Sequence, residues 1–300
     1  LRTAVALAEQ RNEGAIADRA RLLLARTLMA QARFAEAIAI AQQILAHGIP
    51  DYQIDTELLW ATALSIEGVD LEGAAQHLQH AIGAVATPPT PEQQAHIQFE
   101  LGGLAAQQGD LPAAITHYRQ TLAIAEANPE VVLYRVLALN NLAYHLMLLG
   151  YPTAQSYAVR GLELATEQGL LGFQPYLHST LGEIALAEHD LNTAEQQFNQ
   201  GLAIAEQLNI RERIAGITAN LGLLAIQRGQ PTRAIHRLAT AQAQADALGT
   251  NHLAALIRMW LAPLLPPEEA RVALAEARAI AQAGRRKRLL DEIAQIEARL

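Results

Sequence analysis

The hydrophobic positions of this chain recur at the three- and four-residue spacing of amphipathic helices, and this pattern is itself repeated. A leucine followed by a small residue returns at intervals of 41, 39 and 40 positions, with a turn eight residues after each leucine. An alanine and then a bulky residue follow the turn. The leucine pairs are Leu101-Gly102, Leu142-Ala143, Leu181-Gly182 and Leu221-Gly222. The turns are Gly109-Asp110, Gly150-Tyr151, His189-Asp190 and Gly229-Gln230, and the alanines are Ala114, Ala154, Ala194 and Ala234.

Each unit predicts two antiparallel helices. The small residue after the leucine lets the two helices approach closely, and Asp110, Asp190 and Asn192 begin second helices. One such pair cannot bury its own apolar face, so neighbouring units must stack. The sequence therefore predicts an all-α fold, a right-handed superhelical solenoid of antiparallel helix pairs with about seven repeats plus terminal helices.

We expect a single solenoid over residues 1–300. Residues 1–12 match the second helix of a unit and are expected to be the trailing helix of a preceding repeat. Residues 13–283 hold about seven helix-pair repeats, and residues 284–300 form a C-terminal capping helix. The proline-rich segment 87–91 is expected to be a rigid loop between the second and third units.

The order Leu-Gly, Gly-Asp, Ala, Phe or Tyr, and Ala- or Gly-Leu resembles the tetratricopeptide repeat (TPR) family. The unit here is about 40 residues rather than the usual 34. This longer variety resembles the repeats of kinesin light chains, of bacterial Rap-type regulators and of maltose-activator-like signalling ATPases. The segment Leu139-Asn140-Asn141-Leu142-Ala143 is close to the kinesin-light-chain phrase. The resemblance implies a repeat region of a larger bacterial protein in signalling or transcriptional regulation.

Charge is distributed unevenly along the chain. Residues 34–118 contain ten acidic residues and no lysine or arginine. This stretch cannot neutralise phosphates, so we expect no nucleic acid partner through it. It forms either a weakly charged surface or a negative face that attracts a basic partner. The basic run Arg285-Arg286-Lys287-Arg288 could contact nucleic acid or an acidic partner, but is expected to be a solvated face or a junction with a further domain.

Several kinds of chemistry have no support in the sequence. There is no cysteine, no phosphate-binding glycine loop and a single lysine, Lys287. His77 and His80 stand three apart on one helix and could provide two metal ligands, but no third ligand is evident nearby in sequence. We therefore expect no metal, no cofactor and no enzymatic activity. No secretory signal or membrane-spanning run is visible, so we expect a cytoplasmic protein with no membrane partner.

The first helices of the units are expected to line a concave groove. The residue before each motif leucine would face that groove, and its neighbours add further polar and aromatic side chains. The groove candidates are Asn140, Asn141, Tyr144, Tyr176, Ser179, Thr180, Glu183 and Asn220. The resemblance implies that Asn141 and Asn220 clamp the backbone of a bound peptide. In the alternative, these asparagines bond to adjacent helices or face water.

Two functions from different classes remain open. The first is a non-enzymatic protein–protein interaction scaffold, whose groove binds a peptide or helix of a partner or of its own flanking domains. The second is a solenoid that senses a small molecule, which would need a closed, aromatic-lined pocket. A structural spacer is a third, more distant option. The open ends of a solenoid could also support a homodimer.

Overall fold

A computed structural model describes residues 1–31, 33–68, 70–84, 88–284 and 286–299. Within these ranges the chain forms α-helices and two short 3₁₀ helices, and no strand occurs among them, which confirms the predicted all-α fold. The first helices of the chain are α1 (Arg2–Gln10), α2 (Gly14–Ala30), α3 (Phe34–His47), α4 (Pro50–Glu67), α5 (Leu71–Gly83), α6 (Pro91–Gln108), α7 (Leu111–Ala127) and α8 (Val132–Leu148). They are followed by α9 (Ala154–Glu167), α10 (Gln174–Ala187), α11 (Leu191–Gln207), α12 (Arg211–Gln227), α13 (Pro231–Leu248), α14 (Asn251–Leu261), α15 (Pro267–Ala283) and α16 (Lys287–Glu297).

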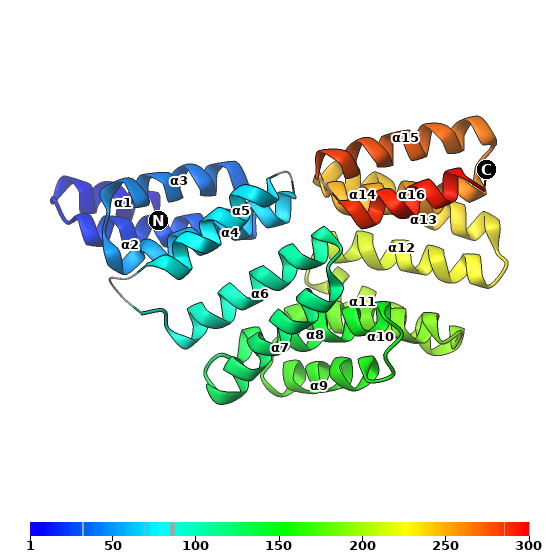
Figure 1. Cartoon of the computed structure of the whole chain (residues 1–300), viewed down its shortest axis with the longest axis horizontal. Helices are drawn as coiled ribbons and strands as arrows, with labels where there is room; N and C mark the ends of the chain where they lie inside the picture. The colour runs from blue at the N-terminus through cyan, green and yellow to red at the C-terminus, as the bar shows by residue number, and fades with distance from the viewer. Residues whose placement is uncertain (32, 69, 85–87, 285, 300) are drawn as a thin grey trace.

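The helices stack in sequence order as antiparallel pairs, from α2/α3 to α14/α15 (Figure 1). Each even-numbered helix from α2 to α14 also contacts the next even-numbered helix. Successive odd-numbered helices from α3 to α15 do not approach each other as closely within the described ranges. The even-numbered helices therefore lie on the inner, concave side of the curve, and we call them the inner helices.

The turn residues found in the sequence act as helix caps. The carboxylates of Asp70, Asp110 and Asp190 each accept a hydrogen bond from the backbone N–H three residues later, at 2.8, 3.0 and 3.1 Å. Asn192 was expected to share this role, but it lies one residue inside α11, where Asp190 is already the cap. Gly109 ends α6 with a φ of +87°, a left-handed conformation that glycine adopts without a Cβ clash.

The glycine after the motif leucine is the place where the two helices of a unit meet. A Cβ on Gly182 would lie 2.4 Å from Phe198 Cε1, and one on Gly222 would lie 2.7 Å from Leu238 Cγ. A Cβ on Gly102 would lie 2.7 Å from Cε1 of Tyr118. The bulky residue of the second helix thus packs directly on the backbone of the first helix, as the repeat pattern predicts.

The curve brings the C-terminal helices back to the second repeat, and in Figure 1 the blue N-terminal helices and the red C-terminal helices both lie in the upper half of the view, at its left and right, with α7 to α11 below them. α16 packs on α15 and α14 and also contacts α6. Arg286 is buried, and its guanidinium lies so close to Gly68 that a Cβ there would be 1.9 Å from Nη2. The predicted solvated basic face is therefore wrong for Arg286, while Arg285 lies outside the described residues. Arg288 Nε donates to Glu292 at 2.8 Å within α16.

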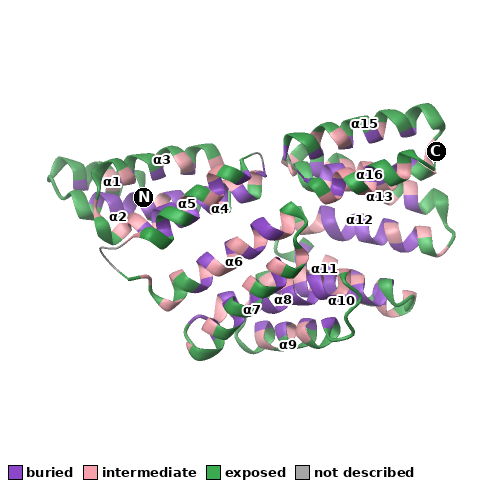
Figure 2. Cartoon of the chain, viewed as in Figure 1, coloured by how far each residue is buried: buried purple, intermediate pink, exposed green. Residues whose placement is uncertain are grey.

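Buried residues run along the inner helices and along one face of each outer helix (Figure 2). They form a series of small apolar clusters, each shared by neighbouring helices, rather than one central core. Thr87, at the start of the predicted proline-rich loop, lies outside the described residues. Among the described helices, none has the length and apolar character required to cross a membrane.

Candidate functional site

All eight groove candidates lie on three successive inner helices in the middle of the solenoid. α8 carries Asn140, Asn141 and Tyr144. α10 carries Tyr176, Ser179, Thr180 and Glu183, and α12 carries Asn220. The sequence pattern therefore selected residues on neighbouring helices, and their side chains make different contacts there.

Five of these side chains form two neighbouring hydrogen-bonded groups, which together we call the inner polar network: Asn140 with Thr180, and Ser179 with Glu183 and Asn220. The hydroxyl of Thr180 donates to Asn140 Oδ1 at 2.9 Å and joins α10 to α8. Asn220 Nδ2 donates to Ser179 Oγ at 3.1 Å and to Glu183 Oε1 at 2.7 Å, which joins α12 to α10. Asn140 and Asn220 thus bond to adjacent helices, the alternative that the sequence left open beside a peptide clamp.

Glu183 is the acceptor that Ser179 and Asn220 share. Burial raises the pKa of its carboxyl group above the usual value, and the hydrogen bonds from Ser179 and Asn220 oppose that shift. Ser179 donates to the same oxygen, Oε1, at 3.0 Å. A carboxyl group held by two side-chain donors in a partly dehydrated site has a fixed position on the concave surface.

Asn141 differs from the other two asparagines. Its amide donates to Leu137 O at 3.2 Å, within its own helix, and the side chain is half-buried. It makes no bond to a neighbouring inner helix among the described residues. Asn141 is therefore the groove asparagine whose side chain can be redirected to a ligand without breaking a contact between helices.

Two tyrosines flank the network. Arg213 of α12 lies over the ring of Tyr176, with the guanidinium carbon 4.4 Å from the ring centroid. Burial, and then the charge of Glu183, raise the pKa of Tyr144, so its hydroxyl stays protonated and can donate. Arg213 Nε is buried and has no hydrogen-bond partner in the described structure. The site therefore contains a cationic donor beside an aromatic ring, next to hydrogen-bonding side chains.

Toward the N-terminus the inner helices are more acidic. Glu100 of α6 is buried and accepts a hydrogen bond from Thr62 of α4 at 2.9 Å, and His96 Nε2 lies 3.4 Å from the same carboxylate. Tyr134 of α8 lies close to this group, and its pKa is raised by burial and then by the charge of Glu100. One carboxylate of the acidic stretch 34–118 thus lies on an inner helix.

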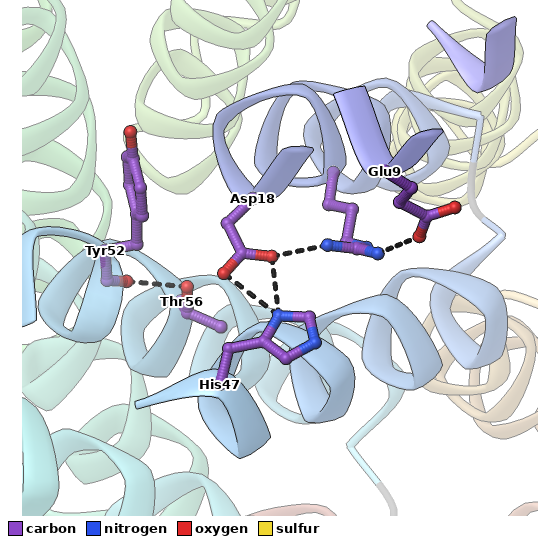
Figure 3. Close-up of polar contacts among 6 residues, drawn as sticks. Glu9, Asp18, His47, Tyr52 and Thr56 are labelled. Carbon is purple, nitrogen blue, oxygen red and sulfur yellow. Dashed lines mark hydrogen bonds and ion pairs between the residues drawn. The ribbon is translucent and has the colours of Figure 1, made fainter. Parts of the chain in front are cut away.

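Sequence reasoning missed two polar clusters. Asp18 of α2 is fully buried, and its carboxylate accepts from Arg21 Nη1 at 2.7 Å and lies 2.9 Å from His47 Nδ1 of α3 (Figure 3). Arg21 also pairs with Glu9 of α1, so this cluster joins the first three helices. The signal was a charged residue at a position where the helix pattern calls for an apolar one.

The second missed cluster corrects the view that His77 and His80 lack a third ligand. Glu57 of α4, which is 5% exposed, lies between them. Its Oε2 is 2.6 Å from His77 Nδ1 and its Oε1 is 3.5 Å from His80 Nδ1. Since Glu57 is on the other helix of the unit, its distance along the sequence concealed its proximity in space.

A shallow, open hollow is lined by Leu221, Leu224, Ala225, Arg228, Gln230 and Arg233, and its roughly 170 Å³ of free space includes open solvent rather than an enclosed cavity. It lies at the far end of α12 from Arg213. Pockets that enclose small organic ligands are usually about 300–1,000 Å³. This hollow is not a closed, aromatic-lined site of the kind that the small-molecule alternative requires.

Neither a protein-family model nor a curated protein matches the sequence. Solved structures do match in fold. A Rap protein complexed with Competence and Sporulation Factor has a TM-score of 0.71 at 16% identity, over 92% of this chain and 79% of that one. NprR in complex with its cognate peptide NprX has a TM-score of 0.65 at 14% identity, over 94% and 84% of the two chains.

A third structure, the Rap conjugation gene regulator of plasmid pLS20 in complex with the Phr* peptide, has a TM-score of 0.63 at 13% identity. The match covers 93% of this chain and 94% of that chain. The fold is of the tetratricopeptide-repeat type. At these identities the likeness concerns the path of the TPR solenoid, and it assigns no residue of this chain a role.

Proposed function

We propose that this chain is a non-enzymatic protein-interaction scaffold whose concave surface binds an extended peptide or a helix across α8, α10 and α12. The observation that carries the proposal is the unpartnered, buried Nε of Arg213 beside Tyr176, next to the inner polar network. A buried donor without an acceptor is costly, and a peptide carbonyl or carboxylate would satisfy it. Two of the fold neighbours are complexes with peptides, which supports the same class of ligand.

Each groove residue has a distinct part in this proposal. Asn141 offers a donor and an acceptor to a peptide backbone, whatever the sequence of the peptide. Tyr144 and Tyr176 provide flat apolar surfaces with a polar tip, and Arg213 pairs with an acceptor of the ligand. The inner polar network holds the three helices in register, so that these side chains stay correctly placed.

The acidic region around Glu100 indicates the charge of one end of the ligand. An extended chain that continues from α8 toward α4 would pass Glu100 and Asp55, whose charges also act on Tyr134. Opposite charge on the ligand would increase its association rate. We therefore expect basic side chains at the end of the ligand that lies over α4 and α6. The partner is a separate protein or a flanking domain of the same protein.

The test is selection from a random peptide library with the whole chain as bait. The selected peptides are then titrated against the wild type, Asn141→Ala, Arg213→Gln and the control Gln200→Ala, which changes an exposed residue of the outer helix α11. Loss of one good hydrogen bond of about 1.4 kcal/mol weakens binding about tenfold. We expect weaker binding for the two groove variants and unchanged binding for Gln200→Ala. Recovery of no peptide, or equal affinity for all four proteins, would refute the proposal.

A further inference from the structure

We propose that Glu57, His77 and His80, which we call the Glu57 cluster, bind a zinc ion. The carboxylate comes from α4 and the two imidazoles come from α5, so the site joins the two helices of the second repeat. One ligand atom from each of the three residues lies within 4.8 Å of the others. The cluster lies outside the part of the groove formed by α8, α10 and α12, and zinc binding is measured without a peptide, so the proposal stands or fails independently of that groove.

The first reason is charge. Glu57 is a buried carboxylate, and a buried charge needs a compensating cation. Residues 34–118 contain no lysine or arginine, and Glu57 pairs with neither residue type in the described parts of the chain. Only the two imidazoles face its oxygens there. A divalent cation supplies the missing positive charge and makes use of neutral imidazoles as ligands.

The second reason is the donor set and its geometry. Two imidazole nitrogens and one carboxylate form a known type of zinc site, with a fourth position left for water or another ligand. Tetrahedral zinc–ligand bonds of about 2.0–2.2 Å place ligand atoms roughly 3.3 Å apart. The separation from Glu57 Oε1 to His80 Nδ1 is 3.5 Å, close to that value. The hydrogen-bonded pair of Glu57 and His77, at 2.6 Å, must open slightly as the ion replaces the proton.

The ring of His77 is already oriented for this role. Trp60 of α4 stacks on it, with the ring centroids 4.0 Å apart and an angle of 24° between the planes. The side chain of His77 is 16% exposed, whereas that of His80 is 62% exposed. His80 can therefore turn toward an incoming ion while Glu57 and His77 stay fixed, and the ion would enter from the solvent side.

The third reason comes from the other repeats. Glu57 stands eleven residues before the turn glycine Gly68, and Gln98 stands eleven before Gly109. His77 stands three residues after the motif alanine, as does His117, which bonds to Gln98 Oε1 at 2.8 Å. The fifth repeat has the reverse pair, His178 with Gln197, also at 2.8 Å.

A histidine–glutamine bond thus occupies this position in the third and fifth repeats. The second repeat departs from it in two ways. It has a carboxylate in place of the amide, and a second histidine, His80, where the third repeat has Gln120. Both changes convert a structural hydrogen bond into a set of metal ligands. A requirement for packing alone would be met by the histidine–glutamine pair.

The test is calorimetric titration of the whole chain with ZnCl₂, together with the visible spectrum after addition of Co²⁺, which reports tetrahedral coordination. Wild type is compared with Glu57→Gln, which installs the contact of the third repeat and is expected to fold normally, and with His80→Gln on the surface. The matched control is His236→Gln, which removes an exposed histidine of α13. Far-UV circular dichroism checks that all four proteins have equal helicity.

We expect one zinc ion per wild-type chain, and zinc affinity at least about 10-fold lower in Glu57→Gln and His80→Gln, because each loses a direct ligand. The control should retain the wild-type affinity, and zinc should raise the thermal midpoint of wild type and control alone. Absence of zinc binding by the wild type would overturn the proposal and leave the cluster as an ion pair. Equal binding by all four proteins would also overturn it, because the ion would then occupy another site.

Discussion

The close contact between Gly182 and Phe198 predicts that one added methyl group, in Gly182→Ala, destabilises the chain. Replacing Gly182 with alanine would place a Cβ 2.4 Å from Phe198 Cε1 and 2.5 Å from Cδ1, whereas real Cβ atoms essentially never approach within 3.0 Å. Phe198 has an exposed fraction of 0% and belongs to a packed cluster with Ile217 and Leu221, so its ring has no space to withdraw into. The helices α10 and α11 must therefore separate by several tenths of an ångström.

Two opposing contributions decide the magnitude. Overpacking a well-filled core costs about 1–3 kcal/mol, and the rigid ring places Gly182→Ala in the upper part of that range. Alanine gains about 1 kcal/mol over glycine inside a helix. We expect a net loss of about 1–2 kcal/mol in the free energy of unfolding. The assay is urea unfolding followed by far-UV circular dichroism, with hydrogen exchange of the α10 and α11 amides as a local measure.

Gly103 provides the matched control. It is also a helical glycine, in α6, but a Cβ there would meet its nearest neighbour, the hydroxyl oxygen of Tyr118, only at 4.0 Å. Gly103→Ala should therefore stabilise the chain by about 0.5–1 kcal/mol through helix propensity alone. We therefore expect the free energy of unfolding to fall in Gly182→Ala and to rise in Gly103→Ala. A Gly182→Ala protein as stable as the wild type would refute the view that close packing at this glycine holds the unit together.

Two further predictions concern buried charge. Asp18→Ala should lower the free energy of unfolding by about 3–5 kcal/mol in urea titrations, because the buried guanidinium of Arg21 loses its buried partner and keeps only the half-exposed Glu9. A loss under about 1 kcal/mol would contradict this. For Glu183, the raised pKa means that the folded state keeps a proton that the unfolded state has lost, so stability falls as the pH rises from the unfolded to the folded pKa. Glu183→Gln should therefore flatten the pH dependence of the thermal midpoint and stabilise the chain most at neutral pH. An unchanged pH profile would show that Glu183 does not cause this pH dependence.

The sequence was sufficient to predict the helix pairs because their signal is repeated. Gly102, Gly182 and Gly222 recur at one point of the unit, and each lies against the bulky residue that the same pattern selects on the second helix. Asp110 and Asp190 cap second helices for the same local reason. These features depend on contacts inside one unit, where the spacing along the chain determines the distance in space.

Contacts between units, and between helices of opposite direction, were harder to predict. The pattern placed Asn220 and Glu183 on the concave side, but not in contact, because their bond depends on how α12 is offset along α10. Glu57 was missed for a related reason: the register between α4 and α5 depends on the length of the turn that joins them. The bond between Gln98 and His117 shows that register in the third repeat, so a comparison between repeats would have found Glu57.

The contact of the C-terminal helices with the second repeat has a consequence for folding. A linear array of repeats interacts only with its neighbours, so it can fray from either end one unit at a time. Here Arg286 packs against Gly68, and α16 contacts α6, which joins units far apart in the sequence. Fraying of the last repeat therefore also removes contacts from the second, and this link between remote units makes unfolding more cooperative and folding more dependent on non-local contacts.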